Sequence, residues 1–211
     1  MERSKKGFFS FSGIDGSGKT SVIQEIDRTL NQKGISSAIF VNHEPFSAYW
    51  NNIKKIKDAL QMCGRDLDYE TDRIFHTLEL MIKLDQGLPK LFGDNSVVLS
   101  DRYVLDKLVY GGLRGDMGIT REVLLSLNHI PEVTFFLDIS PELAYERLIK
   151  RGPPYDWKEN LEILNAARER YNMEIQTYEG KVIKIDASKS LEEITQIILD
   201  YIYNKLFIER I

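Results

Sequence analysis

A short segment near the amino terminus, GIDGSGKT at residues 13–20, has the residue types and spacing needed to hold a polyphosphate. Glycines let backbone N–H groups turn toward phosphate oxygens, Lys19 can bridge the β and γ phosphates, and the Thr20 hydroxyl can bind Mg²⁺. The residues expected to bind nucleotide are Gly13, Ile14, Asp15, Gly16, Ser17, Gly18, Lys19 and Thr20. The alternative is that the loop has this sequence pattern but does not bind a nucleotide.

The residues on both sides of this loop favour nucleotide binding. An apolar segment with Phe8, Phe9 and Phe11 comes before the loop, and residues 21–30 after it have helical spacing. The motif requires this order of strand, loop and helix, because the helix N-terminus completes the phosphate site. A signalling GTPase would also need D-x-x-G and N-K-x-D, and neither string occurs after Gly18.

A second group of chemically active residues, Asp101-Arg-Tyr103, directly follows an apolar run at residues 97–100. A parallel sheet delivers side chains at this position into the ligand crevice. Asp101 can hold Mg²⁺ or receive a proton from the phosphoryl acceptor, and the Arg102 guanidinium can bind a phosphate with two parallel hydrogen bonds. The alternative is a helix N-cap with a surface ion pair.

The pattern of apolar residues predicts the elements that position these groups. Short apolar runs, typical of strands buried on both faces, lie at residues 8–12, 37–41, 97–100, 133–137 and 182–185. Helical spacing is found at residues 17–33, 50–62, 70–84, 121–127, 141–150, 157–178 and 191–206. The alternation predicts an α/β fold of the P-loop NTPase type, a five-stranded parallel sheet with helices on both faces.

Length and composition bound the organisation of the chain. With 211 residues, 43% of them apolar, we expect a single domain over residues 1–211. Residues 151–156, Arg-Gly-Pro-Pro-Tyr-Asp, interrupt the helical pattern and predict a short mobile flap at about 151–158; a plain turn is the alternative.

Charge and cysteine content exclude several kinds of partner. The net charge of -4 argues against a nucleic acid polymer, and no apolar run approaches the eighteen or so residues that a membrane span needs. The single cysteine, Cys63, excludes an intrachain disulfide and fits the reducing cytoplasm. The three histidines lack the spacing of zinc ligands.

Six short segments, taken in order along almost the whole chain, resemble the thymidylate kinase family. They are FSGIDGSGKTS, His43-Glu44-Pro45, Tyr69-Glu-Thr-Asp-Arg73, Asp101-Arg-Tyr103, PEVTFFLDISPE and Asp186-Ala-Ser-Lys-Ser190. The resemblance implies ATP-dependent phosphorylation of a pyrimidine nucleoside monophosphate, first of all dTMP to dTDP, with Mg²⁺. It also implies a small-molecule nucleotide as the substrate and a chain that can form a homodimer.

The resemblance implies a role for individual residues. On the acceptor side, Arg102 would grip the 5′-phosphate, Asp15 would meet the sugar 3′-hydroxyl, Tyr69 would stack on the pyrimidine, and Arg73 would point at the base edge; Glu44 and Pro45 complete this set. On the ATP side, Ser188 and Lys189 would flank adenine, with Arg147 or Arg151 stacked over its other face. Thr20 and Asp101 would hold the metal.

The chain departs from the family pattern at three positions. The family's transition-state arginine is missing both at Gly16 and in residues 156–159, so that either Lys158, Arg147 or Arg151 supplies the catalytic cation or turnover is slow. His43 replaces an arginine. Asp106 replaces a serine, and a carboxylate facing the base edge would favour the amine of cytosine, unless Arg73 or Lys107 neutralises it and restores tolerance of thymine; the other alternative is that Asp106 points to solvent.

Two rival functions stay open at this point. A deoxynucleoside kinase would use Glu44 to deprotonate a neutral 5′-hydroxyl. A non-catalytic nucleotide-binding module would account for the missing flap arginine.

Overall fold

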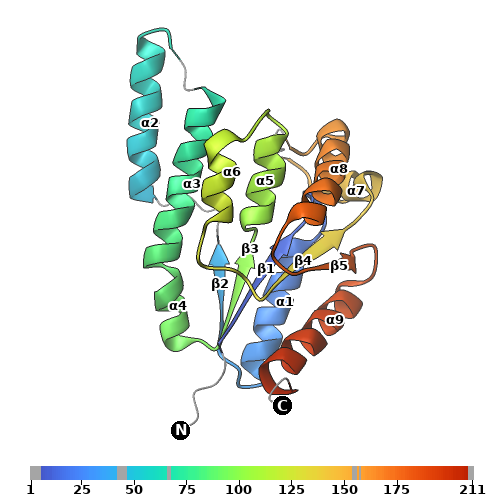
Figure 1. Cartoon of the computed structure of the whole chain (residues 1–211). Helices are drawn as coiled ribbons and strands as arrows, with labels where there is room; N and C mark the ends of the chain where they lie inside the picture. Colours follow the sequence, from blue (N-terminus) through green and yellow to red (C-terminus); the bar gives the residue numbers. More distant parts are fainter. Residues whose placement is uncertain (1–5, 42–46, 66–67, 154–155, 157, 209–211) are drawn as a thin grey trace.

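A five-stranded sheet forms the centre of the protein (Figure 1). The computed structural model describes residues 6–41, 47–65, 68–153, 156 and 158–208. Within them all strands are parallel, in the order β2-β3-β1-β4-β5. The strands are β1 (Gly7–Ser12), β2 (Ser37–Val41), β3 (Val97–Asp101), β4 (Val133–Asp138) and β5 (Val182–Asp186). The predicted parallel α/β fold is confirmed, and each strand bound agrees to within one residue.

The described residues also form nine α-helices. They are α1 (Lys19–Gln32), α2 (Ser47–Met62), α3 (Tyr69–Gln86), α4 (Leu88–Asp94), α5 (Val104–Gly112), α6 (Gly118–Leu125), α7 (Pro141–Arg151), α8 (Leu161–Thr177) and α9 (Leu191–Tyr203), which continues into a π-helical turn at Asn204–Ile208. Seven were predicted. The short α4 and α5 were missed, and the start of the short α6 was predicted three residues late, because fewer than three turns give no clear helical period.

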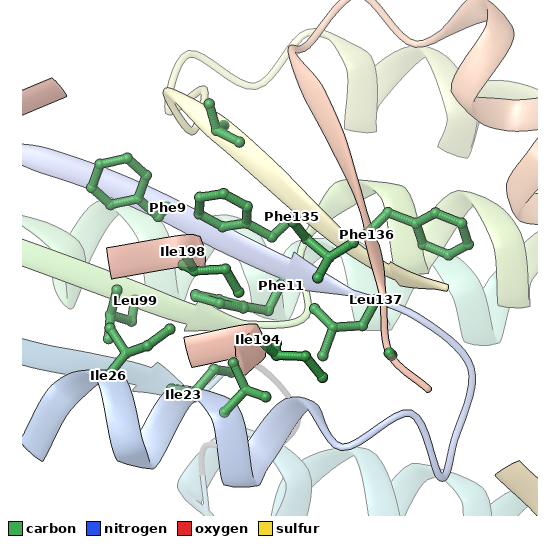
Figure 2. Close-up of a cluster of buried hydrophobic side chains, with 14 of the residues drawn as sticks. Phe9, Phe11, Ile23, Ile26, Leu99, Phe135, Phe136, Leu137, Ile194 and Ile198 are labelled. Atoms are coloured by element: carbon green, nitrogen blue, oxygen red, sulfur yellow. The ribbon is translucent and has the colours of Figure 1, made fainter. Parts of the chain in front are cut away.

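One face of the sheet packs on α1 and α9. Side chains alternate between the faces of a strand, so Phe9 and Phe11 of β1 point to the same side. Figure 2 shows them with Ile23 of α1 and Ile194 and Ile198 of α9, all of which are buried in one cluster. This layer holds α1, and therefore the phosphate loop at its N-terminus, rigidly against the sheet.

The other face packs on a second group of helices. Phe8 of β1 and Val98 of β3 are buried with Leu80 of α3, Leu88 of α4 and Leu108 of α5. Burial of these apolar side chains fixes α3 and α5 beside the end of β3. The side chains at that end of the sheet therefore face two helices that are distant from each other in sequence.

The strand order creates a crevice at the carboxyl end of β1. Because β1 lies between β3 and β4, the chain leaves β1 toward one layer and leaves β3 toward the other, which is where parallel sheets bind ligands. Phe11 is in register with Asp101, so that the phosphate loop and the Asp101-Arg102 pair emerge side by side. No helix among the described residues has the length and apolar character to cross a bilayer.

Candidate active site

The loop after β1 is tightly closed around its glycines. Gly16 has φ +83°, a conformation that L side chains rarely adopt, and a Cβ atom built there would lie 2.4 Å from the Ala144 carbonyl oxygen of α7. No side chain fits at this position without moving α7. The absence of a loop arginine at Gly16 is thus a consequence of how closely α7 approaches the loop.

Lys19 is folded back into the loop that it closes. Only 6% of the residue is exposed, and its Nζ donates hydrogen bonds to the carbonyl oxygens of Gly13 and Ile14, both at 2.9 Å, and to Ser17 Oγ at 3.3 Å. Burial, reinforced by the nearby Arg102 charge, lowers the pKa of Lys19 to about 8. Lys19 therefore still carries its positive charge near pH 7, and bound phosphates would raise its pKa again.

Thr20 and Asp101 meet across the crevice. Thr20 Oγ1 donates to Asp101 Oδ2 at 3.0 Å, which joins the first turn of α1 to the end of β3. A hydroxyl and a carboxylate are hard oxygen ligands, and Mg²⁺ commonly binds to one or two such protein groups together with substrate phosphates. The two predicted metal ligands therefore fit Mg²⁺ in chemistry and proximity.

Arg102 lies at the centre of the site in a strained backbone conformation. It is the one non-glycine residue among those described that has a positive φ, at 66°. Its Nη2 donates to Asp15 of the phosphate loop and its Nη1 to Asp106 at 2.9 Å, while its guanidinium lies 5.4 Å from the centre of the Tyr110 ring. The two carboxylates raise the pKa of Arg102, against the effect of burial, so it keeps its charge.

The Asp15 carboxylate is charged as well. Burial by itself would raise its pKa, but the Arg102 and Lys19 cations outweigh burial and hold the pKa below its ordinary value. Asp15 and Arg102 therefore form an ion pair that links the phosphate loop to the end of β3.

The Asp106 carboxylate is buried and forms an ion pair with Arg102. The expectation that it points to solvent is wrong, because the residue is 4% exposed. Its carboxylate also accepts hydrogen bonds from Tyr171 Oη at 2.6 Å, from Ser12 Oγ and from the Tyr103 backbone N–H at 3.4 Å. Both carboxylate oxygens are engaged by these donors. The geometry therefore gives no support to the second expectation, in which Asp106 reads the amine of a cytosine.

A cavity of about 630 Å³ opens over the phosphate loop. It is lined by Asp15, Gly16, Gly18, Lys19, Thr20, Ser21, Asp101, Arg102, Arg147, Leu148, Arg151, Asp156, Lys158 and Glu159. We call it the donor cavity. It places Arg147 and Arg151 of α7 beside the loop, where Arg151 also forms an ion pair with Glu159 at 2.7 Å, and their contact with ATP stays a prediction.

A second cavity, of about 540 Å³, lies between α3, α5 and α6, and we call it the acceptor cavity. Its lining comprises Asp72, Arg73, His76, Thr77, Glu79, Arg102, Tyr103, Asp106, Lys107, Tyr110, Gly111, Arg114, Met117, Thr120, Leu124 and Lys158. Arg73 lines this cavity, where its Nη1 donates to the Gly111 carbonyl at 3.4 Å, and its role at the base edge stays a prediction.

The two cavities share two cationic residues, Arg102 and Lys158. Lys158 also lies 5.4 Å from the centre of the Tyr110 ring. A negatively charged group passing from one cavity to the other would therefore move between two positive charges.

Some predicted residues do not line either cavity. Tyr69 is 60% exposed, and its ring centre lies 5.3 Å from the guanidinium carbon of Arg114. This arrangement does not support stacking of Tyr69 on a base. Ser188 and Lys189 lie in the turn between β5 and α9, and their contact with adenine stays a prediction. Glu44 and Pro45, with the neighbouring His43, lie outside the described residues, as does part of the predicted flap.

Sequence reasoning missed much of the acceptor cavity. Tyr110 of α5, His76 of α3 and Thr120 of α6 were not predicted as site residues, and Lys107 was considered only as a cation that could neutralise Asp106. One signal was available, because Arg102, Asp106 and Tyr110 are spaced four residues apart, as on one face of a helix. Without the prediction of α5 this spacing had no meaning.

Comparison with known proteins agrees with this geometry. The family model described as thymidylate kinase matches residues 11–198. A thymidylate kinase of Ligilactobacillus salivarius is 29% identical over 93% of this chain and 97% of its own length, and a probable thymidylate kinase of Sulfolobus acidocaldarius is 29% identical over 93% and 96%. A thymidylate kinase of Mycoplasma mobile is 30% identical over 70% of this chain and 72% of its own. The chain therefore belongs to the thymidylate kinase family.

Proposed function

We propose that this protein transfers the γ phosphate of ATP to dTMP and so forms dTDP. The observation that carries the proposal is the junction of two cavities at Arg102 and Lys158, with the phosphate loop on one side only. Membership of a family of nucleotide phosphotransferases supports the same reaction and the use of ATP as cosubstrate.

The residues of the junction can align and neutralise the reacting phosphates. Lys19 and the loop N–H groups would hold the ATP phosphates, and Arg102 would exchange part of its pairing with Asp15 for the acceptor phosphate. An oxygen of that phosphate then attacks the γ phosphorus as the bond to the β-bridging oxygen breaks, releasing ADP. The acceptor phosphate is already ionised, so positioning and charge neutralisation suffice without a strong general base.

Thr20 and Asp101 would hold Mg²⁺ in the donor cavity. When bound, the ion supplies positive charge to the phosphate oxygens of ATP. Asp101→Asn keeps the size of the side chain and lowers its charge, and should raise the Mg²⁺ concentration needed for half-maximal activity. Unchanged Mg²⁺ dependence would remove Asp101 from the metal site.

The experiment that tests the function is a screen for ADP production. The protein is mixed with ATP, Mg²⁺ and each common nucleoside monophosphate in turn, with the matching nucleosides offered in parallel. We expect the largest kcat/KM with dTMP. A preference for nucleosides would support a deoxynucleoside kinase, and ATP binding without acceptor-dependent ADP release would support a binding module.

We also propose that the protein is a homodimer in the cytoplasm. The exposed face of α3 carries Ile74, Leu78, Met81 and Ile82 at helical spacing, a stripe that a second copy could cover. Sedimentation should give a dimer for the natural chain and a monomer for Leu78→Glu, whereas Ile130→Glu, at an exposed apolar site off this helix, should leave the dimer intact. The single cysteine, exposed Cys63, and the use of ATP support the cytoplasmic location.

A further inference from the structure

The acceptor cavity contains polar atoms that the protein itself leaves without partners. Arg73 Nε and Thr120 Oγ1 are buried, line this cavity, and have no hydrogen-bond partner among the described residues. Buried polar groups in folded proteins are nearly always satisfied, so such atoms at a cavity wall indicate a polar ligand. A ligand in this cavity can therefore offer hydrogen-bonding groups to Arg73 and Thr120.

Lys107 extends this polar wall. It lines the acceptor cavity one residue after Asp106 on α5, is partly buried, and its Nζ has no hydrogen bond or ion pair with any residue that the structure describes. A lysine ammonium has three donors and no acceptor. In this cavity it can therefore donate to an acceptor atom of the ligand.

The neighbouring residues Asp106 and Lys107 have opposite consequences for base selection. The Asp106 carboxylate is occupied by Arg102 Nη1 at 2.9 Å and by Tyr171 Oη at 2.6 Å, whereas the Lys107 ammonium is available to the ligand. An ammonium attracts the O4 carbonyl of thymine or uracil. It repels the N4 amine of cytosine, because both groups carry only donors at that edge.

We propose that Lys107 is a specificity-determining residue, whose ammonium donates a hydrogen bond to the O4 carbonyl of the acceptor base and thereby selects thymine or uracil over cytosine. This inference rests on the proposed function, in that the acceptor cavity holds a pyrimidine nucleoside monophosphate.

The environment of Lys107 makes this recognition dependent on pH. Burial lowers the pKa of Lys107 to about 8, opposed by Glu79 of α3 and by Asp106, while Lys83 of α3 and Lys158 lower it further. His76 of α3, which also lines this cavity beside Asp72, has its pKa lowered to about 4 by burial and by Lys107, so it is neutral near pH 7. The ammonium is therefore present below pH 8 and is lost as the pH rises above 8.

The test measures binding rather than turnover. Calorimetry at pH 7 gives the Kd of dTMP and of dCMP for the natural protein, Lys107→Met, Lys107→Arg and the control Lys90→Met, which changes an exposed lysine of α4. We expect Lys107→Met to lower the ratio of the dCMP Kd to the dTMP Kd by about 5- to 150-fold. Lys107→Arg, which keeps a charged donor, and Lys90→Met should preserve the ratio.

The pH profile separates Lys107 from other lysines. Between pH 7 and pH 9 the Kd of dTMP should rise about tenfold for the natural protein, following titration near pH 8, and much less for Lys107→Arg, because arginine stays charged. An equal rise in both proteins would assign the titration to another group such as Lys19. That result, or an unchanged ratio in a folded Lys107→Met protein, would overturn the proposal.

The outcomes for Lys107 and for the enzyme are distinguishable. If dTMP binds with the expected selectivity but no ADP forms, the proposed function fails and the role of Lys107 in binding stands. If dTMP is phosphorylated and Lys107→Met keeps the natural ratio, the function stands and the role of Lys107 fails.

Discussion

The donor and acceptor cavities recognise their ligands by different physical means. The donor cavity is centred on one continuous loop, with α7 beside it, and the glycines and helix N-terminus of the loop present backbone N–H groups to phosphates of any nucleoside triphosphate. The acceptor cavity is assembled from side chains of α3, α5 and α6, several of them charged or without partners. Backbone recognition suits a charge, whereas side chains distinguish one base from another. Damage to the donor side should therefore lower turnover for all acceptors, and damage to the acceptor side should change the choice among them.

The largest effect is expected on the donor side, for Lys19→Ala. The lysine charge stabilises the transferring phosphoryl group, and we expect kcat to fall roughly 100- to 1,000-fold for dTMP and for any weaker acceptor alike. Steady-state kinetics checks the loss, with circular dichroism as the control for folding. Natural turnover in this variant would remove Lys19 from the mechanism.

At the junction, Arg102→Ala should affect binding and chemistry together. Loss of the guanidinium removes a contact with the acceptor phosphate and its alignment, so that the KM for dTMP should rise and kcat/KM should fall by about 100-fold. Initial rates at varied dTMP and at varied ATP separate the two substrates. If only the KM for ATP changes, Arg102 belongs to the donor cavity alone.

Lys158 should contribute less, because its side chain is 30% exposed and faces water as well as both cavities. We expect Lys158→Ala to lower kcat about tenfold, less than a buried donor, with little change in either KM. Lys158→Arg should retain or exceed the natural rate, since a guanidinium can bind a phosphoryl group with two hydrogen bonds. Equal kcat in all three proteins would leave Arg147 or Arg151 as the catalytic cation.

The smallest effect is expected for Asp106→Asn, and it distinguishes the role of Asp106 from that of Lys107 in the acceptor cavity. Asp106→Asn keeps the shape of the side chain but weakens its hold on Arg102, so the KM for dTMP should rise severalfold while the preference for dTMP over dCMP stays constant. Kinetics with both nucleotides checks this. A changed preference would mean that Asp106, and not only Lys107, reads the base.

Local sequence was sufficient to predict those strands and helices that depend on residues close together in the chain. The runs around Phe9 and Phe135 are apolar on both faces, as strands buried between two helical layers must be, and their bounds were predicted to within one residue. The beginning of α8 was less well predicted. The side chain of Asn160 caps this helix by accepting from the Ile163 N–H at 2.9 Å, and the helical pattern alone suggested an earlier start.

The sequence by itself determined the phosphate loop, the parallel sheet around it and the placement of Asp101 and Arg102 at a strand end, because these follow from residue type and spacing over short distances. Tertiary structure decided which side chains meet. Packing of α7 against Gly16 excluded a loop arginine, and packing of α8 brought Tyr171 to Asp106 and turned that carboxylate toward Arg102. Lys107 was left to line the acceptor cavity. Hydrogen bonds between residues more than sixty positions apart leave no periodic signal in a sequence, so the pairing of Asp106 with Tyr171 could only be read from the folded chain.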